Sequence, residues 1–224
     1  MKTITTSIGL VMVSSSLLTL DARAALWQAD NLYMNVDAGA VFQQDATLKQ
    51  SINGGPVSSA SATFDTGFRG DVTLGYNLNN AWAVELETGV IWNSVDKVGG
   101  VKLDSLNQRL ELYQIPILVN AIYKIPTSGH WTPYFGVGAG GVVNISDASF
   151  PGGSGATEFT FAYQAEAGVN YAFSKRCSAN LAYKFFGTLD PSWNWTLPAG
   201  GGTDHGTISG VYTHSLVAGI TWTF

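Results

Sequence analysis

The sequence has one cysteine, few charges and, beyond its first residues, no long apolar run. Because Cys177 is the only cysteine among 224 residues, an internal disulfide and a CxxC metal or redox motif are both excluded. Charged residues make up 12% of the chain, which is about half the share usual in soluble proteins. No later apolar stretch approaches the roughly 18 residues of a membrane-spanning helix, so a helical membrane protein is excluded.

Clusters of basic residues are absent as well. The chain carries 11 Lys and Arg against 16 Asp and Glu, a formal net charge of −5. Nucleic-acid binding requires clustered Lys and Arg, so we expect no nucleic-acid partner. No HExxH or similar metal spacing occurs, and no helical pattern follows the glycine-rich segment at 136–141. We therefore expect neither a metal nor a dinucleotide or other cofactor.

The first residues have the pattern of a secretory signal peptide. Lys2 precedes an apolar core of about 13 residues, and small residues at 22–24 form a cleavage motif. We place cleavage after Ala24, so that residues 1–24 are a signal peptide and residues 25–224 form one domain. An uncleaved N-terminal membrane anchor is the alternative, although the core is short for a span of roughly 20 residues.

The rest of the chain is a succession of eight segments in which apolar and polar residues alternate. In the first of them, Val36 and Ala38 lie on an apolar face, whereas Asn35 and Asp37 lie on the other face. Runs of about 11 to 16 residues exceed the usual five or six of a soluble strand, whereas a tilted membrane-crossing strand needs about 9–11. The pattern therefore favours strands that cross a membrane.

The connections between these runs alternate in length. Those after the second, fourth and sixth runs are short, and the others are longer and polar or rich in glycine. The longer connections are 44–63, 94–107, 146–157 and 190–207. Short turns at one end and long loops at the other are typical of outer-membrane barrels. A soluble β-sandwich, which also has short alternating strands, is the alternative.

Aromatic residues of the apolar face gather near both ends of the runs, with small aliphatic residues between them. Those next to the short turns are Tyr76, Trp82, Trp131, Tyr171, Phe173, Trp222 and Phe224. Those next to the long loops are Phe42, Phe64, Trp92, Phe159, Phe185 and Tyr212. Two such belts match the two interfaces of a bilayer, which favours the barrel over the sandwich.

The expected fold is therefore all-β, an eight-stranded antiparallel transmembrane up-and-down β-barrel. In hydrocarbon no sheet edge stays unpaired, so the first run should pair with the last. We expect this barrel in the bacterial outer membrane, in contact with its lipid, as a monomer with both termini in the periplasm.

Four segments resemble the small outer-membrane barrels of the OmpA/OmpX/Opa type. They are YQIPILV at 113–119, PYFGVGAG at 133–140, AEAGVNY at 165–171 and HSLVAGITWTF at 214–224. The resemblance covers about residues 30–224. In that family the outer-membrane assembly machinery reads a C-terminal strand that ends in Phe, a role that the resemblance gives to Ile220, Trp222 and Phe224. The family includes adhesins and membrane-stabilising proteins and has no shared catalytic residues.

Charged residues on the polar faces are expected to point into the barrel lumen. The predicted lumen network comprises Asp37, Arg69, Asp71, Glu85, Glu87, Arg109, Glu111, Glu166 and Lys184. The interior of an eight-stranded barrel is just wide enough for its own side chains, so buried charges there must pair. We expect a plug of ion pairs and hydrogen bonds. A narrow path that prefers cations, or a site for a small ligand, is the alternative.

Two pairs of residues in the sequence could in principle be catalytic. Glu85 and Glu87 face inward together, and paired carboxylates can serve acid–base chemistry, but we interpret them as partners of Arg69 and Arg109. His214 and the adjacent Ser215 point to opposite faces of a strand and cannot form a nucleophile–base pair by themselves. We expect no catalytic residues.

Two further patterns bear on local structure. Leu110 and Leu112 lie on one parity of the fourth run, whereas the later apolar residues lie on the other, and a β-bulge near Gln114 and Pro116 would explain the change. Trp193 and Trp195 lie in the longest loops and are expected either in the aromatic belt or in contact with a partner.

The expected function is that of a non-enzymatic outer-membrane protein that supports the envelope or contacts an extracellular ligand through its long loops. A narrow porin-like channel is the first alternative and a lipid-modifying enzyme is the second. The choice is a hypothesis from architecture, because a fold does not fix a function.

Overall fold

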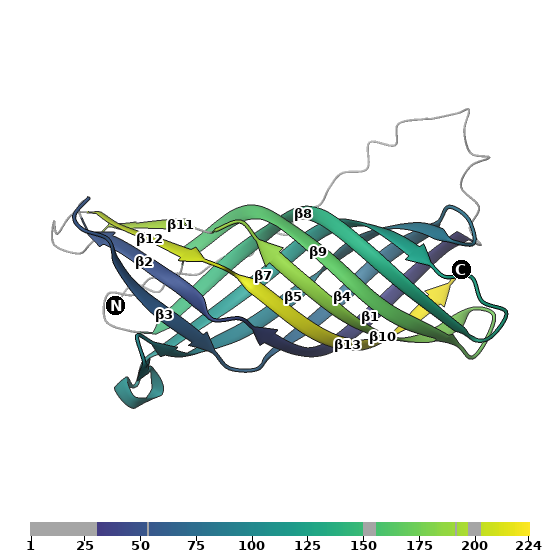
Figure 1. Ribbon diagram of the computed structural model, residues 1–224, viewed down its shortest axis with the longest axis horizontal. Helices are drawn as coiled ribbons and strands as arrows, with labels where there is room; N and C mark the ends of the chain where they lie inside the picture. The colour runs from purple at the N-terminus through teal and green to yellow at the C-terminus, as the bar shows by residue number, and fades with distance from the viewer. Residues whose placement is uncertain (1–30, 53, 150–155, 191, 197–202) are drawn as a thin grey trace, which may run out of the picture.

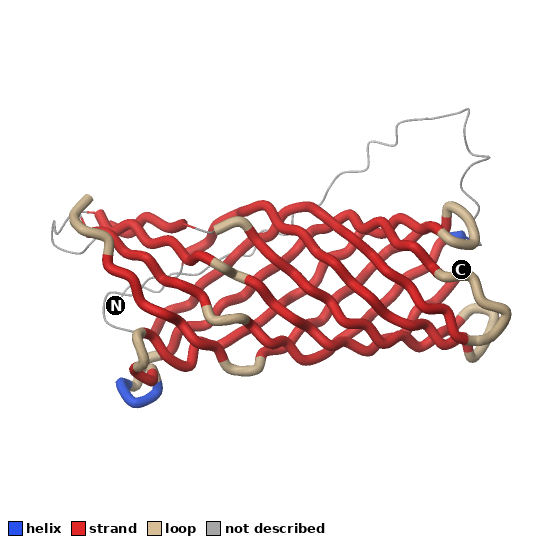
Figure 2. The backbone as a smooth tube through the Cα atoms, in the orientation of Figure 1, coloured by secondary structure: helices blue, strands red, loops and turns tan. Residues whose placement is uncertain are grey.

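The computed structural model describes residues 31–52, 54–149, 156–190, 192–196 and 203–224. Within these residues the chain forms a long, closed barrel of tilted strands (Figures 1 and 2). No helix in this part of the chain is long and apolar enough to cross a lipid bilayer. The predicted signal peptide at 1–24 lies outside the described residues.

Eight strands form the barrel wall, each antiparallel to both of its neighbours. They are β1 (Leu32–Gln43), β4 (Gly67–Asn77), β5 (Trp82–Val98), β7 (Arg109–Lys124), β8 (Trp131–Ser149), β9 (Ala156–Ala172), β10 (Cys177–Thr188) and β13 (Tyr212–Thr223). Each strand pairs with the next one in this series. The prediction of an eight-stranded antiparallel up-and-down barrel is confirmed.

The barrel closes between its first and last strands. Val36 of β1 lies opposite Ile220 of β13, and the pairing continues along both strands. The backbone N–H of Phe224 donates to the carbonyl of Leu32 at 3.1 Å, so the pairing reaches the last residue. The predicted pairing of the first run with the last is confirmed, and it leaves the wall without an open edge.

Short turns connect the strands at one end of the barrel, which we call the turn end. They span residues 78–81, 125–130 and 173–176. In the first of them the side-chain oxygen of Asn79 accepts from the backbone N–H groups of Ala81 and Trp82 at 2.8 and 2.9 Å. Such a side-chain acceptor fixes a tight turn without a long loop. The C-terminus lies at this end (Figure 1).

At the opposite end, which we call the hairpin end, the wall continues as additional strands. They are β2 (Ala46–Ile52), β3 (Ser58–Phe64), β11 (Ser192–Thr196) and β12 (Thr203–Ser209). Their order is β11-β12-β2-β3-β5, so the hairpins extend the sheet of the barrel (Figure 1). The short strand β6 (Val101–Lys102) and the 3-10 helix η3 (Asp104–Leu106) follow β5. Within the segments predicted as long loops at 44–63 and 190–207, most of the residues that the structure describes therefore belong to paired strands.

The outer face of the wall is apolar. Leu86 and Val119, for example, have exposed fractions of 52% and 57% although both lie in the middle of their strands. Aromatic rings contact one another near the turn end, where the centroids of Trp131 and Tyr171 lie 4.6 Å apart. An aliphatic band with aromatic residues at its borders is the surface that a bilayer requires.

Strand β7 keeps one register along its whole length, so the predicted bulge near Gln114 and Pro116 is wrong. Its pairing with β8 is continuous from Arg109 to Lys124, and Leu112 and Gln114 both face inward. The parity seemed to change because the outward face itself changes along the strand, from Arg109 and Glu111 near the hairpin end to Ile117 and Val119 further along. Next to the two charged residues, the inward Leu112 has the pattern of a lipid-facing residue, and alternation alone did not reveal which face is inside.

Candidate functional site

The inward side chains fill the lumen in successive levels, because each strand directs every second residue inward. A network of charged side chains occupies the middle. We call it the central charge network, and it consists of Asp37, Arg69, Asp71, Glu87, Gln164 and Lys184. An apolar layer lies on its hairpin side, and a cavity lies on its turn side.

Arg69 organises the central charge network. Its side chain is fully buried, and its Nε atom donates to Asp71 Oδ2 at 2.6 Å. Its Nη2 atom donates to Glu87 Oε1 at 2.7 Å and to Gln164 Oε1 at 2.5 Å. A planar guanidinium with several fixed donors suits such a site, because it bonds to partners on three strands at once.

Lys184 joins the same carboxylates from β10. Its Nζ atom lies 2.9 Å from Asp71 Oδ2, 3.3 Å from Glu87 Oε2 and 3.4 Å from Asp37 Oδ2. The network therefore holds two cations against three carboxylates. Buried charges are tolerated when they are paired in this way, and removal of one partner leaves the others uncompensated.

The lumen on the hairpin side of this network is closed by apolar side chains. The apolar layer consists of Val41, Ile91, Leu118, Val142, Ala162 and Phe186, none of which is exposed. The Phe186 ring lies under the Arg69 guanidinium at 5.9 Å, so the two levels are in contact. Further toward the hairpins, the Gln114 amide donates to Asn144 of the neighbouring strand β8 at 2.9 Å.

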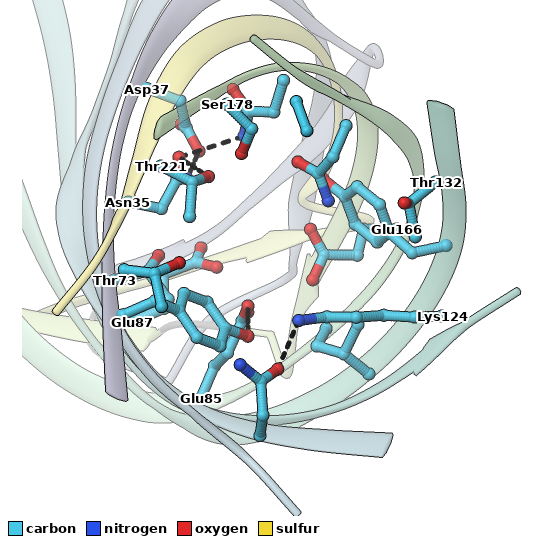
Figure 3. Close-up of a pocket in the computed structure, with 18 of the residues that line it drawn as sticks. Asn35, Asp37, Thr73, Glu85, Glu87, Lys124, Thr132, Glu166, Ser178 and Thr221 are labelled. Atoms are coloured by element: carbon cyan, nitrogen blue, oxygen red, sulfur yellow. Dashed lines mark hydrogen bonds between the residues drawn. The ribbon is translucent and has the colours of Figure 1, made fainter. Parts of the chain in front are cut away.

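The lumen on the turn side holds a cavity of about 180 Å³, which we call the turn-end cavity (Figure 3). Its wall includes ends of strands near the short turns, at Asn77, Thr132 and Thr223. Its polar lining also includes Tyr33, Asp37, Glu85, Glu87, Lys124, Tyr134, Glu166 and Asn180. The cavity thus joins the turn end of the barrel to the central charge network.

Aromatic and charged side chains are interleaved in this cavity. The Tyr33 hydroxyl donates to Glu85 Oε1 at 2.5 Å. The Lys124 ammonium donates to Asn77 Oδ1 at 2.6 Å and lies 4.4 Å from the centroid of the Tyr33 ring. Lys124 is thus held by an amide and an aromatic face rather than by an ion pair.

Glu166 has a different environment. Its Oε1 atom is buried and has no hydrogen-bond partner. The residue lies across from Gly136 of β8, where an added Cβ would come within 2.7 Å of the same oxygen. Gly136 therefore has a local purpose, because a side chain at this position would occupy the space that the carboxylate fills.

Most of the charged residues predicted for the lumen do lie there. The structure brings together Asp37, Arg69, Asp71, Glu85, Glu87, Glu166 and Lys184. Arg109 and Glu111 lie on the outward face of β7, and their predicted place in the lumen is wrong. Glu111 accepts a hydrogen bond from the Tyr113 hydroxyl at 2.8 Å, on that same face.

Three lumen residues were missed by the analysis of the sequence. Tyr33 and Gln164 have the same parity as Asp37 and Glu166, so alternation carried the signal, but only charged residues were selected. Lys124 shares the parity of Leu118 and Asn120, which the apolar residues at 115–123 leave on the inward face, so alternation carried the signal for Lys124 as well.

The histidine considered for catalysis lies outside the lumen. His214 faces outward, with its Nδ1 atom 2.5 Å from the Tyr183 hydroxyl and its Nε2 atom 2.7 Å from the Gln44 amide nitrogen. Ser215 is buried on the inward face. The two residues lie on opposite faces, as their adjacency predicted, and do not form a nucleophile–base pair.

A closed barrel of eight strands with an apolar outer face and a polar lumen matches a known protein family. The family model described as "Outer membrane protein beta-barrel domain" matches residues 11–224. The chain belongs to this family. Membership in the outer membrane protein beta-barrel family places the protein in the bacterial outer membrane.

Several solved structures share this fold. The outer membrane protein OprG from Pseudomonas aeruginosa has 18% identity and a TM-score of 0.63, over 86% of this chain and 96% of that one. Neisserial surface protein A has 20% identity and a TM-score of 0.51, over 87% and 97%. The outer membrane protease OmpT from Escherichia coli has 9% identity and a TM-score of 0.50, over 88% and 98%. At these identities each likeness shows the fold alone. No curated protein matches the sequence significantly.

Proposed function

We propose that this member of the outer membrane protein beta-barrel family is a non-conducting, non-enzymatic protein that acts through its hairpin end. The observation that carries the proposal is the filling of the lumen. Six apolar side chains with no exposed surface lie directly on a buried charge network, which leaves ions no continuous aqueous path through the barrel. Whereas the lumen is closed, the hairpins extend the wall of the barrel as a sheet, and this sheet has polar residues.

The proposed orientation follows from the asymmetry of the connections. Outer-membrane barrels have short turns on the periplasmic side and longer loops outside the cell. The turn end, with both ends of the barrel domain, would then face the periplasm. The hairpin end would project into the medium and contact an extracellular ligand or neighbouring components of the envelope.

The extended sheet is suited to such contacts because its strands are tied to the barrel. Strand β12 pairs with β2, with His205 opposite Ser51, and β3 pairs with the end of β5. This pairing fixes the hairpins where unpaired loops would move freely. Trp193 and Trp195 lie on β11, next to β12, and their side chains lie outside the described residues.

Conductance is the experiment that tests the closed lumen. The purified barrel, inserted into a planar bilayer, should carry no sustained current across a range of salt concentrations. Leu118→Ser combined with Phe186→Ser provides a positive control, because it opens the apolar layer and should allow current. A steady current that depends on salt in the unmodified protein would overturn the proposal and favour the narrow channel.

The surface role is tested by shortening one hairpin. A chain in which residues 48–60 are replaced by a tight turn keeps the eight barrel strands, so it should still migrate faster on a gel when unboiled. In cells that lack the native protein, the full chain should restore detergent resistance or surface adhesion and the shortened chain should not. Equal restoration by both chains would contradict a role for the hairpins.

Enzymatic modification of lipid is the remaining alternative, and it has a direct readout. Cells with and without the protein should have the same lipid A mass profile. A new or missing acyl chain or headgroup in that profile would make the protein an enzyme and would refute this part of the proposal.

We also propose that Ile220, Trp222 and Phe224 form the signal read by the outer-membrane assembly machinery. All three side chains lie on the outward face at the end of β13, with exposed fractions of 46% to 48%. Phe224→Asp should lower the amount of folded protein in the outer membrane. Phe173→Asp is the matched control, because Phe173 is an exposed aromatic at the turn end but lies outside the last strand. Equal loss in both variants would indicate only a defect in lipid anchoring.

A further inference from the structure

Three carboxylates meet where the turn-end cavity reaches the central charge network. Glu85 and Glu87 come from β5 and Glu166 comes from β9, on the other side of the lumen. One oxygen of each residue lies within 4.8 Å of the others. Figure 3 shows the three side chains among those that line the cavity.

The negative charge of this cluster is only partly compensated. Glu87 forms ion pairs with Arg69 and Lys184. Glu85 and Glu166 have no ion pair within 4 Å among the residues that the structure describes, although Glu85 accepts a hydrogen bond from Tyr33. Two buried carboxylates so close together repel each other, and either a proton or a bound cation relieves that repulsion.

Glu166 is the observation that points to a ligand. Its side chain is in the lumen, the residue is 7% exposed, and its Oε1 atom has no hydrogen-bond partner. Buried acceptors in native proteins are nearly always paired with protein, water or an ion. Because this oxygen lies at a cavity lined by further carboxylates, a cation accounts for it better than another acceptor does.

We propose that Glu85, Glu87 and Glu166 bind a divalent cation of the calcium type in the turn-end cavity. An all-oxygen donor set selects a hard cation over a transition metal. Calcium accepts a flexible, irregular set of oxygen ligands at about 2.3–2.6 Å, whereas magnesium requires a near-ideal octahedron at about 2.1 Å. Three carboxylates from two strands form an irregular set, which favours calcium, with waters in the cavity completing its shell.

Two ammonium groups lie near the cluster, and Lys184 pairs with one of its members, Glu87. Lys184 binds Asp71 and Glu87 from the network side. Lys124 is bound by Asn77 and lies over the Tyr33 ring. Neither pairs with Glu166, which leaves that carboxylate available. The site is independent of the role proposed for the hairpins, because it lies at the other end of the barrel.

Only part of this site is visible in the sequence, as the inward pair Glu85 and Glu87. Metal-binding motifs are recognised by short spacings, and only Glu85 and Glu87 are close in the chain. Glu166 joins them through the closure of the barrel, because β9 and β5 are not neighbours in the sheet. The absence of a histidine motif therefore did not bear on a site built from carboxylates.

Terbium, a luminescent substitute for calcium, provides the direct test. The full barrel is refolded in detergent, titrated with terbium chloride and excited through its tyrosines, since Tyr33 and Tyr134 line the cavity. We expect saturable emission with one ion per barrel, displaced by calcium chloride and much less by magnesium chloride. Emission that does not saturate, or that calcium does not displace, would overturn the proposal.

Two ligand variants and one matched control assign the site. Substitution of a residue that only hydrogen-bonds to a metal ligand already weakens metal affinity about 10- to 100-fold. Because Glu166→Gln and Glu85→Gln change a ligand itself, each should weaken calcium binding at least about tenfold. Glu158→Gln is the control, because Glu158 lies on the same strand as Glu166 but outside the cluster, opposite Asn144. The control should bind calcium normally. Equal weakening in the control, or unchanged binding in Glu166→Gln, would refute the assignment.

A second measurement needs no variant. Because calcium would bind the folded barrel and not the unfolded chain, it should raise the urea concentration at which the unmodified barrel unfolds. Sodium chloride at matched ionic strength should not have this effect. The unboiled gel shift confirms that each sample is folded before titration. Identical unfolding in calcium and in sodium would overturn the proposal even if the glutamate variants fail to fold.

Discussion

The two halves of the lumen are built from the same strands but are filled in different ways. Directly on the hairpin side of the central charge network, six inward residues are apolar and leave no exposed surface. On the turn side, carboxylates, amides, tyrosines and a lysine form most of the lining of a cavity of about 180 Å³. The difference shows that one barrel can hold both a closed apolar layer and a polar cavity. The inward side chains alone determine whether the lumen at a given level is closed or open.

The contrast has a physical origin in what each level must balance. Apolar side chains close the lumen only by packing against one another. The apolar layer therefore cannot contain a gap, and no gap in it is open to solvent. Charged side chains must be paired, and the carboxylates outnumber the cations in the turn-side half. The excess negative charge of the turn-side half is the reason that a cation is proposed there and not on the hairpin side.

The largest expected effect comes from Arg69→Met, which tests whether the network holds the two halves together. Asp71 and Glu87 would lose a fully buried partner. Breaking one side of a buried ion pair costs about 3–5 kcal/mol, so the free energy of unfolding should fall by that amount. Urea titration of the barrel in detergent micelles measures it. A loss of less than about 1 kcal/mol would mean that water or a counter-ion replaces the guanidinium.

The closed apolar layer is tested by Leu118→Ala. Leu118 is fully buried in the apolar layer, so truncation leaves a void and should cost about 2–5 kcal/mol of unfolding free energy. Ile117→Ala is the control on the same strand, because Ile117 faces outward with 52% exposure and lipid can fill the space it leaves. If both variants lose the same free energy, the apolar layer is no better packed than the lipid-facing surface.

The polar cavity is tested by Tyr33→Phe, which removes only the hydroxyl that donates to Glu85. A hydrogen bond to a charged group contributes about 1.5–3 kcal/mol, and we expect a loss in the lower part of that range because the cavity admits water. Calcium should reduce the loss if it binds Glu85, since the carboxylate then has a partner in both proteins. Urea titrations with and without calcium measure both effects. A loss that calcium leaves unchanged would separate the hydrogen bond from the proposed site.

The architecture could be predicted from the sequence because alternation and connection length are local signals. The eight strands and the inward position of Asp37, Asp71 and Glu87 follow from parity. The pairing of β1 with β13 follows from the requirement that no sheet edge stay unpaired in hydrocarbon. Alternation fails where the outward face of a strand changes from polar to apolar, as in β7 between Glu111 and Ile117. It also cannot show which inward residues of distant strands meet, so the approach of Glu166 to β5 came only from the structure.

The smallest expected effect belongs to Arg109→Met, and it decides the orientation of β7. Arg109 is exposed on the outward face of the strand near the hairpin end, and substitutions at such positions change stability by about 0.5 kcal/mol or less. Had the strand contained the bulge expected from its sequence, the same change would have removed a lumen cation. The loss would then approach that of Arg69→Met. Urea titration of the two variants side by side compares them, and equal losses would return Arg109 to the lumen and restore the bulge.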